Sequence, residues 1–145
     1  MADRPVLDQI NLVVRDMDAA VAFYRRLGVD VAATPPPWDR HHRDVHAGGG
    51  VHVDLDSTAF ASRWDEGWPA GQTGVVIGFR VDARETVDRI YADLTGAGYA
   101  GQQRPYDAFW GARYAVVIDP DGNAVGIMSA ADPEHRLPTP EPPAG

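Results

Sequence analysis

The sequence predicts an α+β fold made of two similar modules, each with a strand, a helix and further strands. Three observations indicate this fold: an alternating strand pattern followed by a helical one near the start, the return of that order about 67 residues later, and a hairpin pattern near the end. At 145 residues with 44% hydrophobic content, the chain suits one domain. We expect this domain over residues 1–131, with modules at 5–56 and 74–131 joined by a linker at 57–73.

The first module begins with an alternating stretch over residues 7–14. Ile10 and Leu12 fall on one face of this strand, and Gln9 and Asn11 fall on the other. Asp16 suits a helix N-cap, and an apolar stripe at helical spacing runs from residue 17 to Leu27 before a glycine. Three prolines at 35–37 interrupt the chain, and three glycines at 48–50 precede a second alternating strand over 51–55.

The second module repeats this order. Residues 75–81 predict a strand, residues 85–94 a helix, and a Gly-Ala-Gly sequence at 96–98 its end. Two strands at 114–118 and 124–128 flank an Asp-Pro-Asp-Gly-Asn turn, which predicts a hairpin. Residues 132–145 hold five prolines and little apolar content, so we expect a flexible tail.

Composition restricts the partners and the compartment. A net charge of −8 and the absence of Lys and Arg clusters argue against nucleic acid. No apolar run reaches the ~18 residues that a membrane span requires, and the first residues lack the apolar core of a signal peptide. With no cysteines, the chain suits a reducing compartment, and we expect a cytoplasmic protein. The acidity is compatible with attraction of a cationic molecule or with solubility alone.

Three segments together resemble the vicinal oxygen chelate superfamily, which includes glyoxalases, extradiol dioxygenases and bleomycin-resistance proteins. They are Leu-Asp-Gln-Ile-Asn-Leu-Val-Val-Arg-Asp at 7–16, Ala-Phe-Tyr-Arg-Arg-Leu-Gly at 22–28, and Trp-Gly at 110–111 through the turn at 119–123. The resemblance implies two βαβββ modules forming a curved mixed sheet around a cavity, with helices on the outer side and a homodimer as the assembly.

The same resemblance implies four positions for metal ligands. They correspond here to Gln9, to Val76, to Gly126 and, on the strand at 51–55, to Asp54 with His52 on the same face. Valine and glycine side chains have no atom to donate to a metal. Because a catalytic ion usually needs about three protein ligands, we expect no intact metal site of the family type, and no cofactor.

Aromatic residues and a few polar side chains form the candidate ligand-binding site. Aromatic walls with a few polar groups are typical of small-molecule pockets, although a single tryptophan in a loop is more often a lid on the core. Arg80 suits either the cavity or a structural ion pair. We predict a ligand-binding set of fourteen residues: Gln9, Asn11, Trp38, His52, Asp54, Phe60, Trp64, Trp68, Arg80, Tyr106, Phe109, Trp110, Gly126 and Met128.

Other candidate chemistry is weaker. His42 and His46 have the spacing of a helical metal pair, but the surrounding prolines and glycines favour loop and strand, where the two would not converge. No serine has a Gly-x-Ser-x-Gly context, which argues against a hydrolase. We expect no catalytic residues and a protein that sequesters a small aromatic molecule such as an antibiotic. The alternatives are a glyoxalase-like lyase or isomerase, metal-free or with relocated ligands, and a structural dimer.

Overall fold

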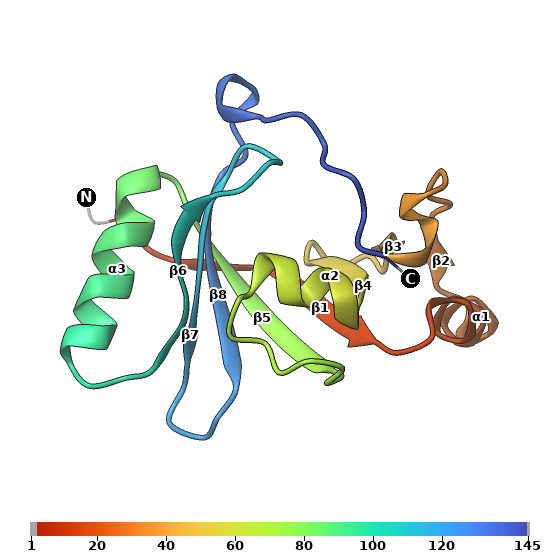
Figure 1. Ribbon diagram of the computed structural model, residues 1–145, viewed down its shortest axis with the longest axis horizontal. Coiled ribbons are helices and arrows are strands. Elements are labelled where there is room, and N and C mark those ends of the chain that lie inside the picture. The colour runs from red at the N-terminus through yellow and green to blue at the C-terminus, as the bar shows by residue number, and fades with distance from the viewer. Residues whose placement is uncertain (1–2, 145) are drawn as a thin grey trace.

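The computed structural model describes residues 3–144 and contains one eight-stranded mixed sheet with three α-helices (Figure 1). The strand order is β2-β3-β4-β1-β5-β8-β7-β6. The elements of the first module are β1 (Val6–Val14), α1 (Met17–Leu27), β2 (Asp30–Val31), β3 (His42–His46) and β4 (His52–Ser57). Those of the linker and second module are α2 (Thr58–Trp64), β5 (Gly74–Val81), α3 (Arg84–Gly96), β6 (Gly101–Asp107), β7 (Arg113–Ile118) and β8 (Ala124–Ser129). The predicted α+β class and modular order are confirmed.

The two modules join through their first strands, which pair antiparallel at the centre of the sheet. Gln9 lies opposite Gly78 and Asn11 lies opposite Val76. With the 67-residue offset, Gln9 corresponds to Val76 and Asn11 corresponds to Gly78. Gln9 therefore pairs with the counterpart of Asn11, and Asn11 pairs with the counterpart of Gln9, as a two-fold axis between the modules requires. In each module the first strand also pairs parallel with the last, β1 with β4 and β5 with β8. The modules therefore pair within one chain.

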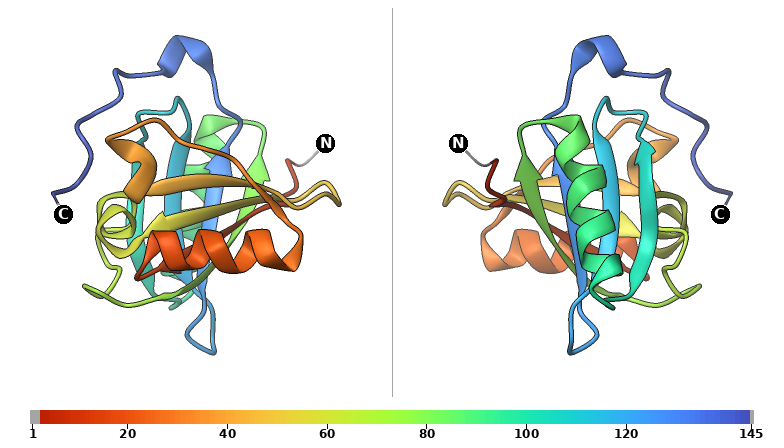
Figure 2. Two further views of the ribbon diagram at one scale, coloured as in Figure 1. Left: turned by 90° about the vertical axis from the view of Figure 1, so that its right-hand side faces the viewer. Right: turned by 90° about the vertical axis from the view of Figure 1, so that its left-hand side faces the viewer.

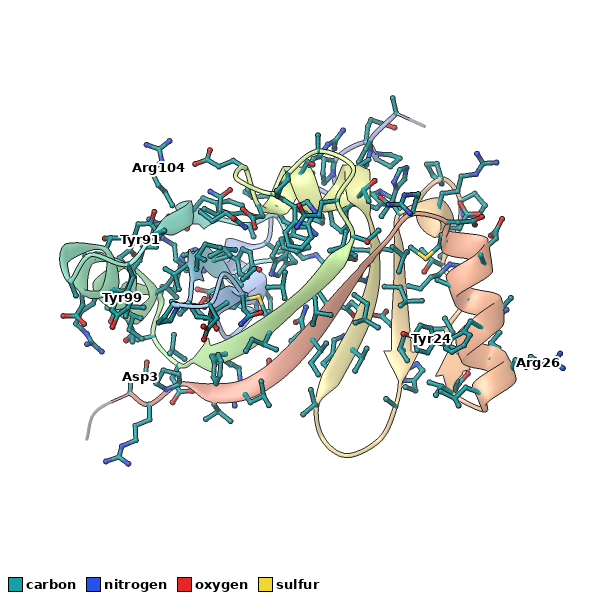
Figure 3. The ribbon with its side chains drawn as sticks, turned by 90° about the horizontal axis from the view of Figure 1, so that it is seen from below. Asp3, Tyr24, Arg26, Tyr91, Tyr99 and Arg104 are labelled. Atoms are coloured by element: carbon teal, nitrogen blue, oxygen red, sulfur yellow. The ribbon has the colours of Figure 1, made fainter. Side chains whose placement is uncertain are left out.

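Helix α1 begins and ends where the sequence predicts. The Asp16 carboxylate accepts a hydrogen bond from the Ala19 amide at 3.0 Å, and Gly28 ends the helix in the left-handed conformation at φ 106°. Figure 3 shows Tyr24 on the side of α1 that faces the strands and Arg26 on the opposite side. Leu27 departs from the predicted apolar stripe, because it is 66% exposed in the last turn.

The outer face of the sheet is covered by one helix per module, as Figure 2 shows. Met17 and Val21 of α1 pack against Leu55, and Val87 of α3 packs against Ile127. Asp3, just before β1, accepts hydrogen bonds from the backbone amides of residues 82 and 83 and so supports the start of α3 (Figure 3). Helices α1 and α3 lie outside the strands at opposite ends of the molecule (Figure 1).

The concave face of the sheet holds the largest core cluster. The predicted linker contributes to it through α2, whose Phe60, Ala61 and Trp64 are buried against Val13 and Val76. The linker is therefore part of the packed domain and covers one end of the concave face. Within residues 3–144, no helix combines the length and the apolar character that a membrane crossing requires.

Candidate functional site

A cavity of about 730 Å³ opens on the concave face, between the strands of the two modules and α2. Ten of the fourteen predicted residues line it: Gln9, Asn11, Trp38, His52, Asp54, Phe60, Trp64, Phe109, Trp110 and Met128. Gln9 and Asn11 both face the cavity from β1, as the predicted alternation places them on one face of that strand. The position of these side chains agrees with the predicted site, and their contact with a ligand stays a prediction.

The other four predicted residues do not line the cavity. Trp68 is buried in the core, with its indole N–H donating to the backbone oxygen of residue 72. The Tyr106 hydroxyl donates to the backbone oxygen of residue 64 in α2. Arg80 donates to Asp82 at 3.1 Å, which is the structural ion pair considered as its alternative. Each side chain supports the fold close to the cavity.

Gly126, the fourth, sits beneath the ring of Tyr114. A Cβ atom added at Gly126 would lie 2.8 Å from the Tyr114 hydroxyl oxygen and 3.1 Å from Cε1. The missing side chain therefore does not enlarge the cavity, because a neighbouring tyrosine, 7% exposed, fills the space. Tyr114 was missed as a lining residue because its strand suggested only a buried hairpin.

We predict that Gly126→Ala lowers the free energy of unfolding by about 1–3 kcal/mol, because the new methyl group overlaps the Tyr114 hydroxyl. In a Tyr114→Phe background the same substitution should cost less, since the closest atom is gone. Urea denaturation of the four proteins in this cycle measures the coupling. Equal costs in both backgrounds would contradict the packing described here.

The metal positions implied by the resemblance do not form a site. Val76 is fully buried in the core, and the space over Gly126 is occupied by Tyr114. In the strand register, Asn11 pairs with Asp54 as Gly78 pairs with Gly126, so Asp54 occupies the position in the first module that Gly126 occupies in the second. Gln9 and Asp54 are thus the remaining members of that set, and the second module offers no donor at its two positions.

The apolar wall of the cavity consists of aromatic rings from both modules. Trp38 meets Phe60 edge-on with ring centroids 4.9 Å apart, and Trp110 meets Phe109 in the same way at 5.2 Å. The Trp110 indole nitrogen lies 3.3 Å from the sulfur of Met128. These contacts fix the rings against one another, so that the wall presents a formed apolar surface to a ligand.

The opposite wall is polar and comes entirely from the first module. His42 Nδ1 lies 2.6 Å from Asp56 Oδ1, and the Asn11 amide donates to Asp56 Oδ2 at 2.8 Å. The Gln9 amide donates to Asp54 Oδ2 at 2.8 Å. His52 Nε2 approaches Asp54 Oδ1 to 2.9 Å. The wall is a connected network on β1, β3 and β4.

Burial and charge shift the pKa values of two members of this wall. Burial alone would lower the pKa of His42, but its hydrogen bond to Asp56 and the nearby carboxylates outweigh burial and raise the pKa to about 9. Burial raises the pKa of Asp54 to about 7, and the charge of Asp56 acts in the same direction. Shifts of this kind cluster at functional sites.

Three members of the polar wall were missed by sequence analysis: His42 as a cavity residue, Asp44 and Asp56. The segment around His42 follows three prolines and lacks apolar alternation, so its sequence did not indicate which of its side chains face the cavity. The available signal was polar rather than apolar alternation, in His-x-Asp at 42–44 and Asp-x-Asp at 54–56. His46 is exposed at the other end of β3, so it does not converge with His42, as expected.

The C-terminal tail crosses the mouth of the cavity. It leaves β8, arches over the concave face and reaches the first module (Figure 1). The backbone oxygen of Pro140 accepts a hydrogen bond from the Trp38 indole at 3.3 Å, and that of Glu141 accepts one from Arg63 at 2.6 Å. Arg136 and Thr139 line the cavity. The expected flexibility of the tail stays a prediction, and no sequence signal indicated its path.

Comparison with known proteins gives one family. The model of the Glyoxalase/Bleomycin resistance protein/Dioxygenase superfamily matches residues 6–127. No curated protein matches the chain.

Three similar solved structures illustrate the range of activities on this fold. The Mn(II)-bound glyoxalase from Novosphingobium aromaticivorans is 21% identical with a TM-score of 0.60, over 89% of this chain and 40% of that one. NAD-dependent benzaldehyde dehydrogenase from Legionella pneumophila is 19% identical with a TM-score of 0.58, over 83% and 96%. Methylmalonyl-CoA epimerase from Mycobacterium tuberculosis is 17% identical with a TM-score of 0.55, over 87% and 88%.

At these identities the three structures show a shared fold and nothing of this chain's activity. The family match spans most of the chain, including both modules and the hairpin turn that closes the second. This chain belongs to the Glyoxalase/Bleomycin resistance protein/Dioxygenase superfamily.

Proposed function

We propose that this protein binds a small aromatic molecule, such as an antibiotic, without transforming it, in drug resistance or in the carriage of a natural product. The observation that carries the proposal is the composition of the cavity of about 730 Å³, which has a wall of packed rings facing a compact polar wall. This volume lies within the range of small-molecule pockets. The family-type ligands of the second module are missing, which supports binding rather than metal-assisted turnover.

The test is a titration of the purified protein with planar aromatic antibiotics, followed by tryptophan fluorescence. We expect saturable quenching, and chromatography should recover the compound unchanged. Trp110→Phe should reduce the quenching, because Trp110 lines the cavity. Trp68→Phe is the matched control, since Trp68 is buried outside the cavity and its loss should leave the affinity unchanged. Absence of saturable quenching across the compounds, or their conversion to a product, would overturn the proposal.

Removal of residues 132–145 should speed the dissociation of a bound aromatic probe by about tenfold, because the tail lies over the cavity mouth. Its contacts to the first module are exposed, so the free energy of unfolding should fall by about 1 kcal/mol or less. Stopped-flow fluorescence measures the rate, and urea denaturation is the control. An unchanged dissociation rate would show that the tail does not cover the bound molecule.

A second candidate function is a glyoxalase-like lyase or isomerase. It is favoured by the shifted pKa values of His42 and Asp54, because a proton donor with a pKa of about 9 beside a carboxyl group with a pKa of about 7 suits general acid–base chemistry. Turnover of a small carbonyl compound by the purified protein would establish this function. Loss of that turnover after treatment with EDTA would show that the reaction depends on a metal ion held by relocated ligands.

The homodimer stays a prediction. Within one chain, side chains from both modules line the cavity. Light scattering coupled to size-exclusion chromatography should give twice the mass of the 15.7 kDa chain.

A further inference from the structure

Three side-chain donor atoms converge at the polar end of the cavity, on the neighbouring strands β3 and β4, and His52 Nε2 lies beside two of them. One donor atom from each of His42, Asp44 and Asp54 lies within 4.8 Å of the others. His42 Nε2 is 3.3 Å from Asp44 Oδ1, and His52 Nε2 is 3.4 Å from the same oxygen and 2.9 Å from Asp54 Oδ1. Ligands about 2.1 Å from a tetrahedral zinc ion are roughly 3.4 Å apart.

The surrounding residues orient these donors. His42 Nδ1 is taken by Asp56, which leaves Nε2 directed towards Asp44. Asp56 is in turn held by the Asn11 amide. A histidine whose second nitrogen is fixed by a carboxylate is the usual outer arrangement around a metal ligand. Gln9 holds Asp54 by one oxygen in the same manner, so that the other oxygen is left free for an ion.

The surroundings of Asp54 Oδ1 point to an ion independently of these distances. Among residues 3–144, Asp54 Oδ1 has no hydrogen-bond partner, although Asp54 is only 5% exposed. His52 Nε2 is close to it but not aligned as a donor. A buried carboxylate oxygen without a partner is costly, because it has lost its water without gaining a hydrogen bond. A cation placed among His42, Asp44 and Asp54 removes that cost.

We propose that His42 Nε2, Asp44 Oδ1 and Asp54 Oδ1, with His52 Nε2 as a fourth donor, bind one divalent transition-metal ion of the zinc type. Neutral imidazole and carboxylate ligands at these separations suit such an ion, and His42 gives up its Nε2 proton when the ion binds. The site uses two strands of one module and needs nothing from the second, where Val76 and Gly126 offer no donor.

The site goes beyond the proposed binding of an aromatic molecule and does not depend on it. His42, Asp44 and Asp54 line the cavity, so the ion would face the space in which a ligand lies. A polar group of that ligand would then meet a metal ion rather than carboxylates alone. Either function can fail in experiment without the other.

The test uses untagged full-length protein stripped with EDTA and titrated with Zn²⁺ in a calorimeter and with Co²⁺ in a spectrophotometer. We expect one ion per chain, a dissociation constant below about 10 µM, and visible Co²⁺ absorption characteristic of four-coordinate nitrogen and oxygen ligands. Asp44→Ala should weaken binding by more than about tenfold. Asp44 is partly exposed, so this variant should keep the thermal stability of the parent.

His46→Ala is the matched control, because His46 is exposed on the same strand and outside the donor set, and it should bind as the parent does. Gln9→Ala should weaken binding without changing the stoichiometry, since Gln9 only orients Asp54. Three results would overturn the proposal: no saturable binding of Zn²⁺ or Co²⁺ below about 100 µM, full affinity in Asp44→Ala, or lost binding in His46→Ala. The aromatic-probe titration, repeated with and without Zn²⁺, reports on the proposed function separately.

Discussion

Trp64→Ala should lower the free energy of unfolding by about 3–5 kcal/mol, the usual cost of truncating a large buried aromatic side chain. Trp64 is 4% exposed and joins the linker helix to the second module, with ring centroids 6.1 Å from Tyr114 and 6.3 Å from Trp68. Its loss removes the ring contacts with Tyr114 and with Trp68. Chemical denaturation followed by circular dichroism measures the change.

Two control variants refine this prediction. Trp64→Phe should cost considerably less, because among residues 3–144 the Trp64 indole nitrogen has no hydrogen-bond partner to lose. Phe23→Ala, at a position 62% exposed on α1, should change stability by no more than about 0.5 kcal/mol. If Trp64→Ala were as mild as Phe23→Ala, α2 would not be a structural part of the domain.

Asp56→Ala should have an effect of similar size, about 3–5 kcal/mol, for an electrostatic reason. Asp56 is 1% exposed and is the shared partner of His42 and Asn11. Its hydrogen bond is a main cause of the raised pKa of His42, so its removal leaves a partly buried imidazolium without its closest carboxylate and the buried Asn11 NH2 group without its acceptor. Urea denaturation at pH 7 measures the loss.

Asp44→Ala is the matched control for this second prediction. Asp44 also neighbours His42, at 3.3 Å, but its side chain is 47% exposed. Water replaces an exposed partner at little cost, so the change should be below about 1 kcal/mol. Equal decreases in the free energy of unfolding for Asp56→Ala and Asp44→Ala would show that burial does not distinguish the two carboxylates.

The sequence was informative about the fold because its patterns are local. The caps of α1, the alternation of β1 and the turn before β8 each depend on residues adjacent in the chain. The 67-residue offset then related the two modules, and the strand register confirms it. Leu27 shows the limit of such patterns, because helical spacing places it on the apolar stripe while its side chain is 66% exposed in the last turn.

The site was predicted less completely because its contacts are distant in sequence. The aromatic wall could be anticipated from composition, since tryptophans in loops are frequent in ligand pockets. The approach of Tyr114 to Gly126 could not, because it depends on the exact pairing of β7 with β8. The partners of His42 are two, twelve and fourteen residues away, and they meet only when β3 and β4 pair.

The unequal chemistry of the two walls gives the cavity a direction. Ionisable groups gather on β3 and β4, whereas β7 and β8 contribute the Tyr114 ring and the Met128 thioether. An elongated ligand with a charged group at one end and a flat apolar body would bind with its charged end towards the first module. In the reversed orientation, the charged end would be buried against hydrocarbon without a partner. The two-fold relation of the modules therefore holds for the backbone and not for the side chains that face the cavity.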